Sequence, residues 1–166
     1  MTPEQARRLH LTGAGIGGAI GAAVLLATPL IASWEGKVNY GYRDIIGVPT
    51  YCYGGTGPNA VVGRHYTDQE CATQLAQDVR SHALPLQRCV SPNTPTPTFA
   101  ALISLSFNIG PDGVCRSSAV RYINAGNIAE GCRRIELYNR AGGQVVRGLV
   151  RRRADERRLC EQGIAR

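Results

Sequence analysis

The first feature of the chain is an uncharged, largely apolar segment that covers residues 11–34. As a helix with a rise of 1.5 Å per residue, this segment would reach about 36 Å, which is enough to cross the hydrocarbon core of a bilayer. Arg7 and Arg8 stand immediately before it, and the positive-inside rule then predicts that the N-terminus stays in the cytoplasm. The pattern therefore predicts a signal-anchor segment over residues 1–33 and an exported unit over residues 34–166.

This predicted anchor is only weakly apolar. Glycine and alanine fill eleven of its twenty-four positions. Its large apolar residues together contribute about 2.5 to 5 kcal/mol to the free energy of membrane insertion. Such a segment could enter a membrane and later leave it. Gly13, Gly17 and Gly21 repeat at four-residue spacing, which either provides a smooth face for helix packing or simply keeps the hydrophobicity low. A cleavable signal peptide is the alternative, but Leu30 and Ile31 occupy positions where cleavage requires small residues, so the pattern favours an uncleaved anchor.

The remainder of the chain changes from a strand pattern to a helical one. Residues 37–66 are rich in tyrosine, valine, isoleucine and glycine, which predicts two or three short antiparallel strands. Beyond residue 66 the apolar positions have a helical spacing. We expect helices to begin after Thr67, at Thr96, at Asn127 and at Arg147. We expect helices to end or break near Pro85, Gly110 and Gly163. A strand-rich lobe followed by a helical lobe is an α+β domain, and the boundary between such lobes commonly holds a substrate cleft.

The charge balance suggests an anionic partner without identifying it. The net charge is +7, an excess typical of proteins that meet nucleic acid, an acidic membrane surface or an acidic cell wall. Asp155 and Glu156 interrupt the main cluster of arginines, as on a solvated helix face. Surface and structural ion pairs are therefore the favoured explanation of the cluster, and a dedicated polyanion site is the alternative. The cluster consists of Arg147, Arg151, Arg152, Arg153, Arg157 and Arg158.

The cysteines indicate an oxidising compartment. Their number is even and they are well spread, which predicts up to three disulfides and a location such as the periplasm. No cysteine belongs to a Cys-x-x-Cys pair or lies near a histidine at ligand spacing, so we expect no metal site. The spacing does not fix how they pair. The six are Cys52, Cys71, Cys89, Cys115, Cys132 and Cys160.

Two carboxylates are the candidates for chemistry. Glu35 stands at the end of the apolar segment, and Asp44 follows nine residues later within the predicted strands. Hydrolysis of a glycosidic bond needs such a pair: a protonated group for the leaving oxygen and an ionised group that acts on water or on the sugar. Trp34 and the C-terminal end of a helix both favour the protonated form of Glu35. As a bare spacing the pair is weak evidence, because surface solvation explains most pairs of this kind.

The neighbours of this pair make it specific. Glu35, Asp44 and Thr50 have the spacing of the catalytic Glu, Asp and Thr of the phage-type lysozymes, glycoside hydrolase family 24, and residues 47–54 resemble that family's Gly-x-x-Thr-x-x-Tyr-Gly pattern. The likeness extends over residues 34–166. Within the family the chain looks closest to the endolysins of lambda-like phages that carry a signal-anchor-release segment.

The resemblance implies a fold and a reaction. The fold would be lysozyme-like, with a small antiparallel β lobe, a mainly helical lobe and an active-site cleft between them, preceded by the signal-anchor helix. Glu35 would be the general acid, Asp44 the carboxylate that positions and activates water, and Thr50 the hydroxyl that holds this water. The family is typically inverting, which requires carboxyl groups roughly 6.5 to 9.5 Å apart. The substrate would be the β-1,4 bond between N-acetylmuramic acid and N-acetylglucosamine in peptidoglycan, with no cofactor, metal or nucleic acid.

Two positions depart from the family pattern. Cys52 stands where many members have glycine, and Gly55 stands where many have histidine. Neither position carries the acid or the base. We therefore expect a tuned cleft or a disulfide there, without loss of the chemistry.

The position of Glu35 directly after the membrane segment suggests a form of control. While residues 11–34 span the host inner membrane, Glu35 would be held at the membrane surface and activity would be withheld. Release of the segment would free a soluble periplasmic enzyme that causes host cell lysis. The alternatives are a lytic transglycosylase, which needs a catalytic Glu but no assisting Asp, and a catalytically silent wall-binding or membrane-anchored protein.

Overall fold

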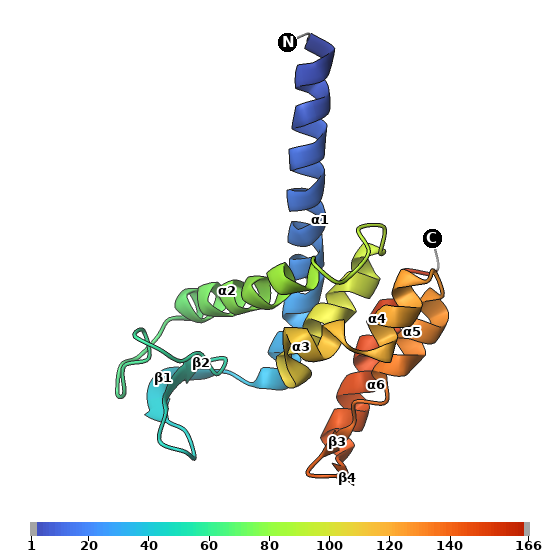
Figure 1. Cartoon of the computed structure of the whole chain (residues 1–166). Coiled ribbons are helices and arrows are strands. Elements are labelled where there is room, and N and C mark those ends of the chain that lie inside the picture. Colours follow the sequence, from blue (N-terminus) through green and yellow to red (C-terminus); the bar gives the residue numbers. More distant parts are fainter. Residues whose placement is uncertain (1–2, 165–166) are drawn as a thin grey trace.

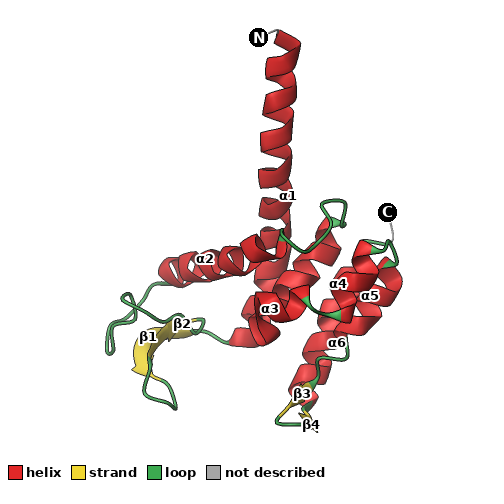
Figure 2. Cartoon of the chain, in the orientation of Figure 1, coloured by secondary structure: helices red, strands yellow, loops and turns green. Residues whose placement is uncertain are grey.

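A computed structural model describes residues 3–164 of the chain, and for residues 3–17 and 19 it describes the course of the backbone alone. A β lobe lies at one end of a mainly helical body (Figure 2). The elements, in chain order, are α1 (Pro3–Glu35), β1 (Val38–Arg43), β2 (Pro49–Cys52), α2 (Asp68–Leu86), α3 (Thr96–Cys115), α4 (Ser118–Asn124), α5 (Ile128–Ile135), β3 (Arg140–Ala141), β4 (Gln144–Val145) and α6 (Arg147–Glu161).

The C-terminal half of helix α1 packs into the helical body of the protein. Its N-terminal half projects away from the other elements (Figure 1). In the C-terminal half, Ala23, Ala27 and Ile31 recur at four-residue spacing on one helix face and are fully buried, and α1 packs against α2 and α3 there. These three residues also belong to the predicted anchor at residues 11–34, so the sequence of the anchor and that of the domain core overlap.

The predicted membrane-spanning helix includes residues whose side chains the structure does not describe. Arg7, Arg8, Gly13 and Gly17 lie outside the residues whose side chains the structure describes. In the described part of the chain, no helix has both the length and the apolar character that a membrane span requires.

The β lobe is a short antiparallel pair. Strands β1 and β2 pair with Tyr42 opposite Thr50, and an irregularity in register separates Tyr42 from Val38. A single bridge between Tyr40 and His65 adds a third segment. The prediction of two or three short antiparallel strands is therefore confirmed.

The predicted helix boundaries are mostly confirmed. Thr67 and Glu70 form the expected capping box at the start of α2. Gly110 interrupts α3 with φ 72° and ψ 158°, a conformation that glycine adopts without strain. Gly163 follows α6, but its φ is not positive; it is needed because a Cβ atom there would lie 2.4 Å from Thr98 Oγ1. Helix α4 and the β3–β4 hairpin were not predicted.

Three disulfides join neighbouring elements, as the cysteine count predicts. Each one links parts of the chain that lie between 19 and 28 residues apart. The first ties β2 to α2, the second ties the segment after α2 to the end of α3, and the third ties α5 to α6. The pairs are Cys52–Cys71, Cys89–Cys115 and Cys132–Cys160.

The packing of α1 can be tested with a matched pair of alanines. We expect Ala27→Leu to lower the free energy of unfolding by about 1–3 kcal/mol, because Ala27 is fully buried and a larger side chain overpacks the contact with α2 and α3. Ala22→Leu, on the exposed face of the same helix, should change it by less than about 0.5 kcal/mol. Urea denaturation of the purified proteins measures both values, and equal values would contradict the packing of α1 in the core.

Candidate active site

Glu35 is the last residue of α1 and makes an ion pair with α6. Its Oε1 atom accepts a hydrogen bond from Nη1 of Arg152 at 2.8 Å. The Glu35 side chain is 28% exposed, whereas that of Arg152 is 6% exposed. The carboxylate therefore lies at the surface of the helical body and is held from beneath by a buried guanidinium.

A buried network holds Arg152 in place. Glu156, which is fully buried, accepts hydrogen bonds from Arg152 Nε at 3.3 Å, Arg153 Nη2 at 2.7 Å and Ser104 Oγ at 2.8 Å. Burial raises the pKa of the Glu156 carboxyl, and the two arginines oppose this shift. The network thus links α3 and α6 to the orientation of Glu35.

The arginine cluster of α6 therefore has more than one role. The prediction of ion pairing is confirmed. The prediction of a solvated surface position is wrong for Arg152 and Arg153, which are buried. Both lie three or four residues before Glu156 on α6, so the three side chains share one helix face, which packs against the helical body. The pairing of Arg152 with Glu35 was not predicted from the sequence, since the two residues lie 117 positions apart.

Asp44 lies in the turn between β1 and β2. Its Oδ1 atom accepts hydrogen bonds from the backbone N–H groups of Ile46 and Val48, each at 2.9 Å. Arg43 closes the same turn by donating from Nη1 to the carbonyl of Gly47 at 2.9 Å. The carboxylate is therefore fixed by the backbone of its own turn.

Thr50 lies beside Asp44 at the same end of the sheet. It is 5% exposed, and its hydroxyl donates to the carbonyl of Val48 at 3.0 Å. Val48 thus contacts both side chains, with its N–H bound to Asp44 and its carbonyl bound to Thr50. Only Gly36, with φ 67°, and Lys37 separate Glu35 from the start of β1.

A histidine from α2 forms a second polar contact within the helical body. His82 stacks on Phe107 with ring centroids 4.2 Å apart, and its Nδ1 lies 3.0 Å from Oγ of Ser106. Ser106 donates its one hydroxyl hydrogen to the carbonyl of Ile103 at 2.6 Å, so it must accept from Nδ1–H of His82. Burial lowers the pKa of His82, while the charges of Asp78 and Glu35 act in the opposite direction.

The two departures from the family pattern have structural explanations. Cys52 forms a disulfide with Cys71, as one of the two expectations states. Gly55 lies against Gln74, and a Cβ atom on Gly55 would stand 2.8 Å from Gln74 Cγ. Gln74 in turn accepts the backbone N–H of Tyr53 at 3.1 Å and donates to Asp78. The absence of a side chain at residue 55 therefore makes room for an amide that connects the sheet to α2.

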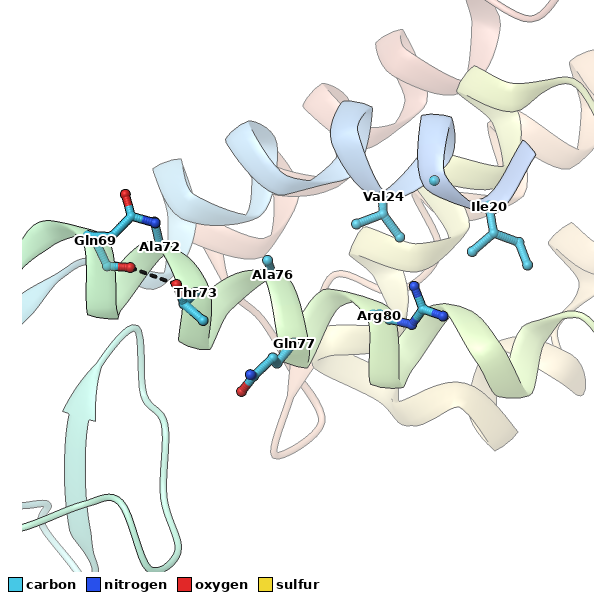
Figure 3. Close-up of a pocket in the computed structure, with 9 residues that line it drawn as sticks. Ile20, Val24, Gln69, Ala72, Thr73, Ala76, Gln77 and Arg80 are labelled. Carbon is cyan, nitrogen blue, oxygen red and sulfur yellow. Dashed lines mark hydrogen bonds between the residues drawn. The ribbon is translucent and has the colours of Figure 1, made fainter. Parts of the chain in front are cut away.

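A separate groove of about 430 Å³ lies between α1 and α2, away from these residues (Figure 3). Ile20, Gly21 and Val24 form its α1 side, and polar and small residues of α2 form the other. It contains none of the predicted site residues. Among the described residues, no three His, Cys, Asp or Glu side chains converge in a way that could hold a metal ion.

Comparison with known proteins shows similarity across both lobes. The family model described as phage lysozyme matches residues 32–156. The SAR-endolysin of Enterobacteria phage P21 is 35% identical over 149 residues, which are 86% of this chain and 90% of that protein. The SAR-endolysin of Bacteriophage PS119 is 34% identical over 165 residues, which are 98% of this chain and 99% of that protein. The structure of the muramidase domain of SpmX from Asticaccaulis excentricus is 28% identical, with a TM-score of 0.72 over 81% of this chain and 93% of that one.

The buried network predicts a large effect of Arg152 on stability. We expect Arg152→Met to lower the free energy of unfolding by about 3 kcal/mol, because it removes one of the two guanidinium groups that pair with buried Glu156 and also removes the ion-pair partner of Glu35. Arg151→Met, at the neighbouring exposed position, should change it by less than about 0.5 kcal/mol. Denaturant unfolding near neutral pH measures both, and a small effect of Arg152→Met would show that the network does not hold α6 in place.

His82 predicts a dependence of stability on pH. Because burial lowers its pKa in the folded state below the ordinary value of 6.5, the unfolded chain binds the proton first as the pH falls, and stability should decrease as the pH drops below about 6.5. In His82→Gln this part of the decrease should disappear, whereas exposed His65→Gln should retain it. Unfolding curves at closely spaced pH values between about 7 and 5 measure the slopes. Identical slopes for wild type and His82→Gln would contradict the burial argument.

Proposed function

The chain belongs to the phage lysozyme family, and we propose that Glu35, Asp44 and Thr50 are its catalytic residues. It is a glycoside hydrolase, a muramidase endolysin that cleaves the β-1,4 bond between N-acetylmuramic acid and N-acetylglucosamine in peptidoglycan. The observation that carries the assignment of these residues is the turn between β1 and β2, which joins Asp44 and Thr50 through Val48. The helix that bears Glu35 ends only two residues before β1, the strand that leads into this turn.

The turn supports a defined role for the attacking water. Because Asp44 Oδ1 accepts two backbone N–H groups, Oδ2 is available to accept a hydrogen from water. Because Thr50 donates its own hydrogen to Val48, it meets the same water as an acceptor. With both hydrogens accepted, the oxygen lone pair of the water is free to attack the anomeric carbon.

The reaction then follows an inverting course. Glu35 gives its proton to the leaving glycosidic oxygen, the bond from that oxygen to the anomeric carbon breaks, and water adds from the opposite face. The proton of this water passes to Asp44. Arg152 stabilises the carboxylate that Glu35 becomes, since the guanidinium lies 2.8 Å from its oxygen. The place of Asp44 and Thr50 favours hydrolysis over transglycosylation, which needs no water activated in this way.

We further propose that residues 11–34 hold the protein in the host inner membrane, with the catalytic part in the periplasm, until the segment is released. The names of the P21 and PS119 relatives support this proposal. The burial of Ala23, Ala27 and Ile31 supports it as well, because these side chains cannot lie within a bilayer and within the domain core at once. Glu35, four residues after Ile31, would reach its place beside Arg152 when α1 packs on the domain.

The acid and the base can be tested by conservative substitution. We expect Glu35→Gln and Asp44→Asn each to lower the rate of peptidoglycan hydrolysis at least about 100-fold, because each removes a proton-transfer step. Exposed Asp112→Asn is the matched control and should remain active. Turbidity of purified sacculi gives the rate, and product analysis should find reducing ends. Anhydro sugars would indicate a transglycosylase, and full activity of Glu35→Gln would contradict the assignment.

The membrane proposal predicts that a more apolar anchor is not released. Gly17→Leu combined with Gly21→Leu should keep the protein in the membrane fraction and delay lysis. The reason is that each leucine makes the free energy of membrane insertion more favourable by about 0.3 to 0.6 kcal/mol. Leu25→Ser, at a position that is 77% exposed in the structure, should have the opposite effect on the membrane fraction. Membrane fractionation of induced cells, followed together with culture turbidity, measures both. Normal lysis timing in the double leucine variant would refute the tether.

A further inference from the structure

Tyr40 presents a large aromatic ring on the surface of the β lobe. It is 57% exposed, whereas the other six tyrosines of the chain are half-buried or buried. A single exposed apolar side chain is ordinary on a protein surface. What distinguishes Tyr40 is its position relative to the proposed catalytic residues.

Tyr40 shares one face of the sheet with the residues proposed to hold the attacking water. Its ring contacts that of Tyr42, with ring centroids 6.2 Å apart. Tyr42 lies opposite Thr50 in the register of β1 and β2, and Asp44 directly follows the end of β1. Side chains alternate along a strand and cross-strand partners point to the same side, so Tyr40, Tyr42 and Thr50 share one face. A continuous surface therefore runs from the turn at Asp44 to Tyr40.

The contact with Tyr42 leaves at least one face of the Tyr40 ring free. The two rings meet edge to face, with an interplanar angle of 64°. In this geometry Tyr42 covers at most one face of Tyr40. The contact also restrains the Tyr40 side chain, so that less conformational entropy is lost when a ligand binds. On the other side of β1, exposed His65 forms a backbone bridge with Tyr40.

This face of the sheet carries no lysine or arginine. Arg43 alternates with Tyr42 along β1 and donates to the carbonyl of Gly47. Arg64 lies over the ring of Tyr66 and pairs with Glu70, and Lys37 pairs with Asp68.

The cations of the β lobe are therefore held away from Tyr40. A neutral partner with apolar surfaces fits this face, whereas an anionic membrane surface or a polyanion would call for free cations.

We propose that Tyr40 stacks on a sugar ring of the glycan strand, beyond the two sugars that share the cleaved bond. This inference rests on the proposed function. One side of a pyranose ring presents C–H groups while its hydroxyls project around the rim, so the sugar can lie flat on an aromatic face and keep its hydroxyls in water. The face that carries Tyr40 is continuous with the site at which the glycan is cut, so the same strand can occupy both.

The length of β1 places this contact away from the cleaved bond. Tyr40 precedes Asp44 by four residues, which is about 13 Å along an extended strand. This separation exceeds the length of one sugar ring. Tyr40 therefore binds substrate without touching the reacting atoms, and its contribution depends on a glycan long enough to reach it.

Two substitutions of Tyr40 separate stacking from other roles. Tyr40→Leu removes the ring but keeps an apolar side chain, and Tyr40→Phe keeps the ring but removes the hydroxyl. Val62→Ala is the control, because Val62 is 49% exposed in the same lobe. Each variant and the wild type are assayed on soluble peptidoglycan strands fractionated by length, and reducing ends are counted. Thermal unfolding checks that all variants fold, and each should unfold within a few degrees of the wild type.

The expected result is a loss in kcat/KM of about tenfold for Tyr40→Leu on long strands, from the removal of one stacking contact. The loss should appear in KM, with kcat unchanged, and should vanish on the shortest strands that the wild type cuts. Tyr40→Phe and Val62→Ala should stay within about twofold of the wild type. A loss that is the same at every strand length, a loss confined to kcat, or an equal loss in Tyr40→Phe would overturn the proposal. If wild-type protein cuts no strand, the proposed function itself fails, which is a separate outcome.

Binding gives a second measurement that does not depend on the rate. In the Glu35→Gln background, calorimetric titration with long strands should show a Kd about tenfold higher when Tyr40→Leu is added. Equal Kd values with and without Tyr40→Leu would overturn the proposal.

Discussion

The ion pair between Glu35 and Arg152 joins the first helix to the last across 117 residues of sequence. It can form only when Arg152 is itself fixed, because an arginine that is 6% exposed needs carboxylates around it. Glu156 provides one of them, and Ser104 on α3 orients Glu156. The placement of Glu35, the proposed general acid, therefore depends on the packing of α1, α3 and α6 together.

Under the proposed membrane tether, the C-terminal half of α1 would have to fit both a bilayer and the domain core. In a bilayer, the large apolar residues of the segment at residues 11–34 would contribute about 2.5 to 5 kcal/mol to the free energy of insertion, and its glycines would reduce this gain. For packing in the core, full burial of one side chain such as Ile31 contributes about 1.5 to 3 kcal/mol. A segment rich in leucine would satisfy the bilayer but could not place Ala23 and Ala27 against α2 and α3.

Local features of the fold could be predicted from the sequence, and contacts distant in sequence could not. The capping box at Thr67 and the break at Gly110 follow from hydrogen bonding and backbone freedom within a few residues. The Gly142–Gly143 turn has an equally local sequence signal, two adjacent glycines, although this hairpin was not predicted. The disulfide pairing and the contact of Arg152 with Glu35 depend on how helices meet, which residue spacing does not encode. For this reason the assignment of Glu35, Asp44 and Thr50 depends on family resemblance as well as on the geometry of the turn.

Helix α2 connects the two parts of the site. On one side, α1 packs against it and carries Glu35. On the other, the β lobe is attached to it by the Cys52–Cys71 disulfide, by the hydrogen bond from Tyr53 to Gln74, and by Lys37 and Asn39, which donate to Asp68 at 2.6 and 2.8 Å. The element that carries Glu35, the proposed acid, and the β lobe that carries Asp44 and Thr50, the proposed water-binding residues, are thus both attached to α2. Because only Gly36 and Lys37 connect α1 to β1, this short link and the attachments to α2 together restrain the position of Asp44 relative to Glu35.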